Sequence, residues 1–409
     1  MPGGAARCVA LDPSACLLAY RQAYRQEAQA VCFCPYRVSP LGAHVDHQGG
    51  PVHGFAIDKG IYLAYRAEPS GQVTLRSANF PGQLDFSLGE IPPKKAGDWA
   101  DHLRGAALLL SQRQSLTVGL SAFIQGTLPI GGLSSSASVI IAFLQALCRL
   151  NDVTLSSREL IDLAQAVENR YVGVSCGKLD QSCEVLSRKD QLLYLDTLDD
   201  SFELIPTPAG MKPYEIAVFF SGLSRSLAGS GYNLRLDECR AAGYSLMAYA
   251  GLPYGAFDQT KLRDIPRGVF EAYRDRLPQA WARRAEHYYS EVARVEAGTN
   301  AWRAGDLEGY GQLIFRSGYS AIHSYECGCE QLITLYEILR DTPGIYGGCF
   351  SGAGFKGCCM ALIDPEQADS IQHQVASRYL AAYPELKDRY SFHLCRSADG
   401  IQQQRSEWL

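Results

Sequence analysis

The sequence predicts an α+β fold divided into two domains. Its 409 residues, 47% hydrophobic and 20% charged, suffice for two hydrophobic cores of roughly 150 to 200 residues each. Strand-like alternation dominates the first hundred residues, whereas helical periodicity dominates the chain from Trp99 onward. We place the domain boundary in the proline- and glycine-rich stretch near residue 210, which divides the chain into 1–210 and 211–409.

Strands are predicted first along the chain. Residues 60–67, 72–80 and 83–91 alternate apolar with polar side chains and are rich in β-branched and aromatic residues. This pattern is typical of strands with one buried face.

Helices follow. The segment DWADHLRGAALLL carries apolar residues at helical spacing, and the segment that begins near Ser136 is apolar nearly all round, which predicts a buried helix. Ser156 and Glu159 have the spacing of a capping box ahead of a third helix. A long amphipathic helix is predicted from Ala280, and a region of strands and glycines from Gly344.

Composition excludes several classes of protein. The 38 lysines and arginines against 43 aspartates and glutamates give a charge of −5, without the basic excess of a nucleic-acid binder. No apolar run approaches the roughly 20 residues that span a bilayer, and no signal peptide is evident, so we expect a cytoplasmic protein without an obligatory protein partner. The 14 cysteines are scattered, which favours reduced thiols. His323, Cys327 and Cys329 lack the fourth ligand and the CxxC spacing of a structural zinc site.

The strongest candidate site is LPIGGLSSSASVIIAF, residues 128–143. Two glycines and three serines precede an apolar helix, so free backbone N–H groups and the positive helix end meet at one point, as in anion sites. Serine hydroxyls there also reach a magnesium ion that accompanies phosphates. The alternative is a flexible turn that caps a buried helix. The segment is not a P-loop, because GxxxxGK[ST] does not match it.

A second glycine cluster, GGCFSGAGFKGCCMALI from Gly347, lies between two apolar runs. Its glycines permit close approach of the backbone either to a ligand or to another strand. Lys356 in this loop meets phosphate or remains solvated.

Polar side chains gather in two further segments. PYRVSPLGAHVDHQGG, residues 35–50, combines Arg37, His44, Asp46 and His47, which suits hydrogen bonding to sugar hydroxyls or a phosphate, with a polar surface hairpin as the alternative. In GVSCGKLDQSC, Asp180 follows two glycines and is either a base or a helix cap.

These four clusters, in this order, resemble the galactokinase branch of the GHMP kinases over nearly the whole chain. PYRVSPLGAHVDHQGG resembles the galactokinase signature, LPIGGLSSSAS the phosphate loop and GVSCGKLDQ the catalytic segment; SLAGSGYNLR, DWADHLRG, CFSGAGFKGC and the helix from Ala280 match further landmarks. The resemblance implies a two-domain fold with mixed sheets and an active site in the interdomain cleft. It also implies transfer of the γ-phosphoryl group of ATP, the co-substrate, to the anomeric hydroxyl of a sugar with the help of Mg²⁺.

The resemblance assigns roles residue by residue. Asp180 matches the catalytic aspartate, and Arg37 matches the arginine that steadies it. Ser136 and Glu168 match the residues that hold magnesium. The implied sugar contacts are Ala43, His44, Asp46, Gly177 and Tyr232. The implied ATP contacts are Gly131, Gly132, Leu133, Ser134, Ser135, Ser136, Ala137 and Trp99, with residues 77–80 on the adenine side.

Four departures from the galactokinase pattern affect which sugar we expect the site to bind. Ala43 replaces a glutamate that accepts a hydrogen bond from the carbon-6 hydroxyl of galactose, Tyr36 replaces a glycine, His47 replaces an aromatic residue, and the phosphate loop has one glycine fewer. These changes predict a rebuilt sugar pocket and leave the path of the loop before Gly132 open.

A carboxylate at carbon 6 would repel a glutamate about 4 Å away by about 1–4 kcal/mol. Alanine removes that repulsion, and His44 or His47, protonated or neutral, would then pair with the carboxylate.

The PLGAH pattern is similar to that of plant galacturonokinases, so galacturonic acid is the first substrate expected. Galactose and L-arabinose, which lacks carbon 6, are the alternatives. A non-catalytic sugar and ATP sensor is the rival class, against which the joint presence of Arg37, Ser136, Glu168 and Asp180 argues.

Overall fold

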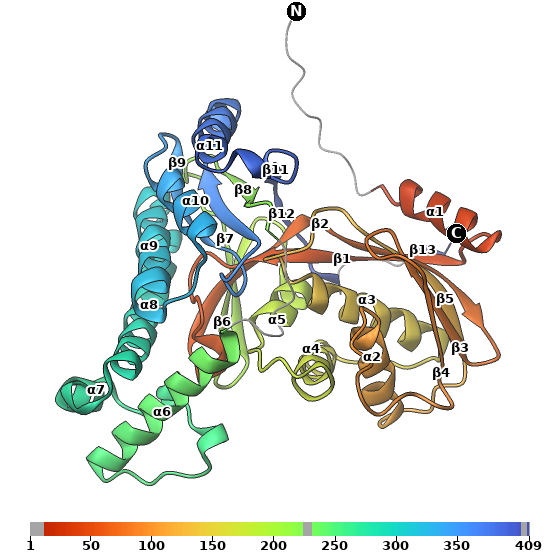
Figure 1. Cartoon of the computed structure of the whole chain (residues 1–409), viewed down its shortest axis with the longest axis horizontal. Helices are drawn as coiled ribbons and strands as arrows, with labels where there is room; N and C mark the ends of the chain where they lie inside the picture. Colours follow the sequence, from red (N-terminus) through yellow and green to blue (C-terminus); the bar gives the residue numbers. More distant parts are fainter. Residues whose placement is uncertain (1–11, 224–230, 402–406, 409) are drawn as a thin grey trace, which may run out of the picture.

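The computed structural model describes residues 12–223, 231–401 and 407–408 (Figure 1). Within these residues the chain forms a nine-stranded sheet, built mainly from the first half, and a four-stranded sheet in the second half. Helices cover both sheets, which confirms the α+β prediction. In this described part, no helix is both long and apolar enough to cross a membrane.

The nine-stranded sheet follows the order β13-β1-β2-β5-β3-β4; off this path, β12 and β6 each pair with β2, and β7 pairs with β6. Its strand pairs are antiparallel except for the parallel pair β3–β5. The strands predicted at 60–67, 72–80 and 83–91 are confirmed, and the first of them belongs to one long strand. The bounds are β1 Ala30–Val38, β2 Pro51–Glu68, β3 Gln72–Ser77, β4 Gln83–Ser87, β5 Gly119–Gly126, β6 Gln191–Asp196, β7 Ser201–Pro206, β12 Ser397–Ala398 and β13 Glu407–Trp408.

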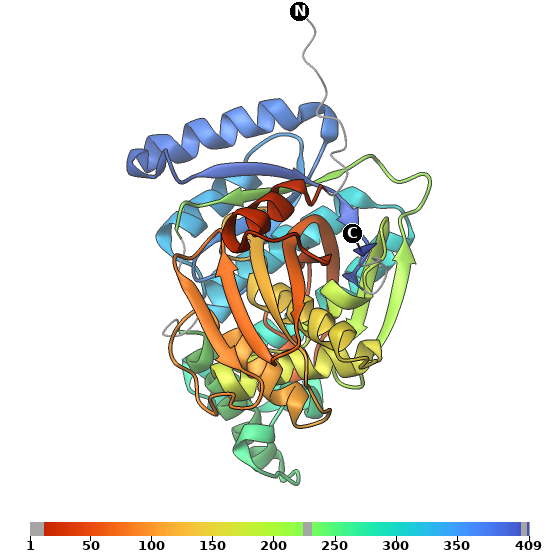
Figure 2. The same cartoon turned by 90° about the vertical axis from the view of Figure 1, so that its right-hand side faces the viewer.

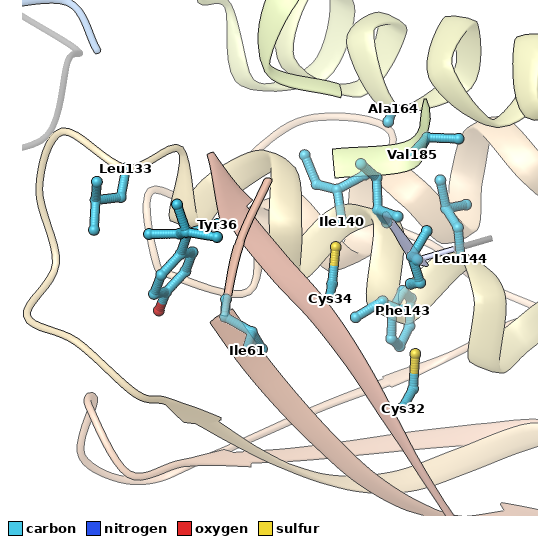
Figure 3. Packing of buried hydrophobic residues seen from close by; sticks show 14 of the residues in the cluster. Cys32, Cys34, Tyr36, Ile61, Leu133, Ile140, Phe143, Leu144, Ala164 and Val185 are labelled. Carbon is cyan, nitrogen blue, oxygen red and sulfur yellow. The ribbon is translucent and has the colours of Figure 1, made fainter. Parts of the chain in front are cut away.

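Helices cover both faces of this sheet (Figures 1 and 2). Alternation along β1 explains the arrangement, because Val31 and Phe33 pack with α1, whereas Cys32 and Cys34 join the large core on the α3 side, where Phe143 lies (Figure 3). The helices of this part are α1 Ser14–Tyr24, α2 Asp101–Ser111, α3 Ser135–Leu150, α4 Ser157–Ala166 and α5 Leu179–Leu186.

Two helix starts that were predicted from the local sequence are present in the structure. Ser156 caps α4, and Glu159 bonds back to it, so the predicted capping box is present. Helix α3 begins at Ser135, one residue before the predicted start, and most of its residues are buried. The thirteen cysteines within the described ranges are free thiols, eleven of them buried.

The second sheet has the order β11-β8-β10-β9 and is antiparallel throughout. The long helix predicted from Ala280 and the strand region predicted from Gly344 are both confirmed as α8, β9 and β10. The elements are β8 Glu215–Phe220, α6 Tyr232–Ala250, α7 Arg267–Tyr273, α8 Gln279–Arg303, α9 Leu307–Ser320, α10 Glu330–Arg340, β9 Ile345–Phe350, β10 Cys358–Ile363, α11 Ala368–Ala382 and β11 Ser391–Cys395.

The chain crosses between the two parts more than once. The second sheet begins at Glu215, yet the late strands β12 and β13 pair with β2 and β1 of the first sheet. The division into 1–210 and 211–409 stays a prediction.

Candidate active site

The loop between β5 and α3 is built by backbone conformation. Gly131 (φ 140°), Gly132 (φ 84°) and Ser134 (φ 59°) all adopt left-handed conformations before the helix begins. A Cβ on Gly132 would lie 2.8 Å from the sulfur of Cys358, so glycine is required there. A Cβ on Gly357 would likewise lie 2.8 Å from the carbonyl carbon of Gly131. The second glycine cluster therefore lets its backbone approach this loop; a ligand contact of the same glycines stays a prediction.

Arg37 connects three segments that are far apart in sequence. This buried arginine at the end of β1 donates from Nε to Asp180 Oδ1 at 2.7 Å and from Nη1 to the carbonyl of Gly132 at 3.1 Å. Ser351, which follows β9, also donates to that carbonyl, at 2.6 Å. The second carboxylate oxygen of Asp180 accepts from Ser134. The site thus lies where loops from both sheets meet.

Ser136 and Glu168 form a pair in the first turn of α3 and in the π-helical turn Val167–Val172 that follows α4. The Ser136 hydroxyl donates to Glu168 Oε1 at 2.7 Å, and Gln181 Nε2 donates to Oε2 at 2.6 Å. Burial and the charge of Asp180 raise the pKa of Glu168 to about 7. A hydroxyl and a carboxylate are oxygen donors of the kind that Mg²⁺ prefers, so the residues present fit that ion.

Asp46 and Gly177 lie against each other. Asp46 begins a short 3-10 turn within the signature segment, and its carboxylate accepts the backbone N–H of His47 at 2.9 Å and that of Leu179 at 3.4 Å. A Cβ on Gly177 would overlap the Asp46 carboxylate, so no side chain fits there. Burial and the charge of Asp180 raise the pKa of Asp46 to about 6.

Two histidines from the same turn gather around Tyr325. The His44 ring stacks on it with centroids 4.0 Å apart, and His47 Nε2 lies 3.1 Å from its hydroxyl. Tyr232, the first residue of α6, lies with its ring centroid 6.3 Å from that of His44 and 6.1 Å from that of His47. Residues 226–230 of SLAGSGYNLR lie outside the described residues.

Both histidines are held neutral. Burial lowers the pKa of His44 well below its usual value, and burial with the Arg240 charge lowers the pKa of His47 to about 3. The amide of Gln48 donates to His47 Nδ1, so Nε2 carries the hydrogen and donates to Tyr325. A protonated histidine facing a sugar carboxylate is therefore disfavoured, and both ring nitrogens of His47 are engaged.

The main chain at Ala43 is held by α8. Glu291 Oε1 accepts the N–H groups of Gly42 at 2.8 Å and Ala43 at 3.2 Å, and His287 Nε2 donates to the carbonyl of Ala43 at 2.8 Å. Both α8 residues are buried. Sequence reasoning missed them, because the helix from Ala280 was matched only as a whole and its periodicity does not mark these two side chains.

Contacts in the structure show where three of the residues that the resemblance assigns to ATP binding lie. The Trp99 ring stacks on Phe80 with centroids 5.7 Å apart, which brings together the two segments expected on the adenine side. The side chains of Leu133 and Ala137 are buried, so these two residues can offer a ligand only their main-chain groups. Tyr36 is 1% exposed and packs in the same core as Leu133 (Figure 3), so the expectation that it reshapes a sugar pocket is wrong. Lys356 lies half-buried in the loop before Gly357.

A cavity of about 420 Å³ opens beside Asp46, His47 and Gly177. Its other walls come from the α4 end, the turn after β6, and Leu236 and Arg240 of α6. Lys178 in its wall is paired with Asp162 and Asp200, each at 2.7 Å. The cavity is large enough for a small ligand.

Comparisons with known proteins agree with this geometry. The GHMP kinase N-terminal domain matches residues 101–188, the GHMP kinase C-terminal domain 299–381 and the galactokinase galactose-binding signature 18–67. The galacturonokinase of Arabidopsis thaliana is 41% identical over 376 residues, 87% of this chain and 88% of the plant protein. The galactokinase of Roseiflexus sp. (strain RS-1) is 31% identical, covering 93% and 95%. Lactococcus lactis galactokinase complexed with galactose superposes with a TM-score of 0.86 at 28% identity, covering 97% and 99%.

The chain belongs to the GHMP kinase family. Within that family it lies in the branch of the galactokinases and galacturonokinases, and it is a sugar kinase that uses ATP. The resemblance stated from the motifs is thereby confirmed. The individual residue roles stay proposals.

Proposed function

We propose that this enzyme transfers the γ-phosphoryl group of ATP to the anomeric hydroxyl of galacturonic acid. The observation that carries the proposal is Ala43, which stands in the galactose-binding signature, is fixed by its main chain and adds no carboxylate to the turn. A glutamate at this position would repel a carbon-6 carboxylate. The 41% identical relative named galacturonokinase supports the same substrate.

Asp180 is the proposed catalytic residue. In the transfer, the anomeric oxygen forms a bond to the γ-phosphorus, the bond to the β–γ bridging oxygen breaks, ADP leaves, and the hydroxyl proton goes to the aspartate. Arg37 Nε, 2.7 Å from Asp180, holds this carboxylate in place. Its Nη1 bond to Gly132 ties the base to the loop proposed to hold the phosphates.

The loop from Gly131 to Ala137 is the proposed phosphate site. Its backbone N–H groups lie before and within the first turn of α3, where the helix dipole favours anions. Ser136 and Glu168 would hold the magnesium ion, which neutralises phosphate charge during transfer. Trp99 and Phe80 offer flat faces for the adenine base.

The sugar lies, in this proposal, between Asp180 and the turn that carries His44 and Asp46. Asp46 accepts ring hydroxyls, with Gly177 leaving room for its carboxylate. His44 is neutral and offers a ring nitrogen rather than a charge. Recognition of a uronate here therefore depends on removing a negative charge from position 43, without a histidine cation to replace it.

One assay tests the proposal. ATP consumption is measured with galacturonate, galactose, glucuronate, L-arabinose and fucose under identical conditions. We expect kcat/KM to be highest for galacturonate and a product phosphorylated at carbon 1. Preference for galactose, which the structural likeness to the Lactococcus lactis enzyme would favour, overturns the uronate assignment but not the kinase. No turnover with any sugar would indicate a sensor.

A further inference from the structure

A buried carboxylate of the second half holds the turn that carries Ala43. Glu291 is 0% exposed, and each of its two carboxylate oxygens accepts at least one hydrogen bond. Oε1 accepts from Gly42 and Ala43 and from the hydroxyl of Ser317 at 2.6 Å, while Oε2 accepts from Arg294 at 2.7 Å. Burial by itself would raise the pKa of Glu291, but Arg294, His287 and Ser317 together lower it, so the side chain is ionised.

His287 lies one turn before Glu291 on α8 and binds the main-chain carbonyl of Ala43. A carbonyl oxygen only accepts, so His287 Nε2 carries a hydrogen and donates to Ala43 at 2.8 Å. Burial lowers the pKa of His287, which leaves Nδ1 to accept from Ser320 at 2.9 Å. Both hydrogen-bonding groups of the Ala43 main chain are therefore satisfied by one helix.

The hold on Ala43 continues directly into the residues proposed to meet the sugar. His44 follows with φ 59°, a conformation that is uncommon for a non-glycine residue, and Asp46 lies two residues further. Helix α8 packs with α9, which supplies Ser317 and Ser320. The position of the turn is thus set by the second half of the molecule.

We propose that Glu291 and His287 are positioning residues for sugar recognition, which clamp the Ala43 turn so that the carbon-6 group of the sugar meets a fixed surface. The inference rests on the proposed function, in that it takes this turn as the sugar site. A loose turn would weaken sugar binding and blur discrimination at carbon 6, whereas the phosphate loop, held by Arg37 and glycines, would be unaffected.

The first test is Glu291→Gln. The amide replaces one acceptor oxygen by a donor, so either Arg294 or the turn loses its partner. We expect KM for the preferred sugar to rise about tenfold, KM for ATP to stay within twofold, and the galacturonate-to-galactose ratio of kcat/KM to move at least threefold towards one. Ser317→Ala, which removes only one donor to Oε1, shows the same pattern more weakly and serves if the first variant does not fold.

The second test uses His287 in two forms. His287→Leu removes the N–H that faces Ala43, whereas the side-chain amide of His287→Gln restores a donor at a similar distance from the backbone. Sugar KM should rise in the leucine variant and return towards the wild-type value in the glutamine variant. A purely structural role does not predict this rescue.

The matched control is Glu238→Gln. Glu238 accepts from the buried Arg284 of α8 at 2.6 Å, so the variant breaks an ion pair on the same helix without touching the turn. Its melting temperature should fall while sugar KM stays within twofold. An active wild type whose Glu291 and His287 variants keep their sugar KM overturns the clamp alone. A wild type that phosphorylates no sugar overturns the proposed function, and the clamp with it.

Discussion

The phosphate loop and the sugar-binding turn, Leu41–Asp46, reach their shapes in different ways. The loop takes its path from glycines in left-handed conformations and from the adjoining glycine backbone at residues 352–357. The turn is held instead by charged and polar side chains of α8, some 244 to 249 residues away in sequence. The proposed phosphate site thus depends on backbone geometry, whereas the proposed sugar site depends on side chains supplied by a distant helix.

The largest expected effect comes from the group between these two regions. Asp180→Asn should lower kcat at least about 100-fold, because a positioned acid–base group contributes 10² to 10⁴. KM for ATP should change little, because the amide oxygen of asparagine can still accept the hydrogen bond from Ser134 of the loop. Single-turnover kinetics with saturating ATP and sugar measures the effect. The structure places Asp180 inside α5, with its carboxylate bonded to Arg37 and Ser134 and not to the helix start, so it is no cap. A variant with wild-type turnover would show that this carboxylate takes no part in the transfer.

Ala43→Glu tests the sugar-binding turn by itself. A new carboxylate would repel galacturonate by roughly 2–4 kcal/mol, which corresponds to about 30- to 1,000-fold in kcat/KM. Galactose gains an acceptor for its carbon-6 hydroxyl and improves by up to about tenfold. Measuring both sugars in wild type and variant gives one ratio of ratios, and a value within a factor of three means that position 43 does not select the carbon-6 group.

Two glycine substitutions separate the regions further. Gly177→Ala pushes a methyl group into the Asp46 carboxylate, and Gly132→Ala pushes one against Cys358. Overpacking of this kind costs about 1–3 kcal/mol, so each variant should raise one KM by about tenfold: sugar KM for Gly177→Ala and ATP KM for Gly132→Ala.

Gly210→Ala is the control for both, because its added methyl group meets nothing within 4 Å. It should keep both KM values within twofold. Equal changes in sugar and ATP KM in either active-site variant would mean that the two regions are not independent.

Sequence reasoning succeeded where the information is local. Period-2 and helical patterns predicted part of β2, β3, β4, α3 and the capping box at Ser156, because each depends on neighbours in the chain. The loop glycines were found for the same reason. Sequence reasoning did not predict that the Tyr36 side chain points into the core, because alternation of apolar and polar residues does not tell which face of β1 becomes the core. The hold of Glu291 on Ala43 is a tertiary contact without any local pattern.

The protonation states of the site residues could not be predicted from the sequence either. The motif suggested histidines able to carry a charge, but burial and the Arg240 charge lower the pKa of His47, and its contacts with Gln48 and Tyr325 fix its hydrogen on Nε2. Composition tells how many charges a chain has, whereas burial decides which of them persist.

The smallest effect expected concerns pH and the sugar-binding turn. Burial, with the charge of Asp180 adding to it, raises the pKa of Asp46 to about 6, so this carboxylate gains its proton as the pH falls through 6. Its ionised form accepts hydroxyl hydrogens in stronger, charge-assisted bonds. Sugar affinity should therefore be full above pH 7 and fall below pH 6, by about fourfold between pH 7.5 and 5.5 for a single group of this pKa. Galactose is the suitable probe because it does not titrate, and its Kd is measured by calorimetry without ATP or magnesium, so that Glu168 plays no part. Asp46→Asn is the control, because its side chain does not titrate; any galactose affinity that remains in this variant should be flat over the same range. A galactose Kd that is flat from pH 7.5 to 5.5 would mean that Asp46 does not bind the sugar through its charge.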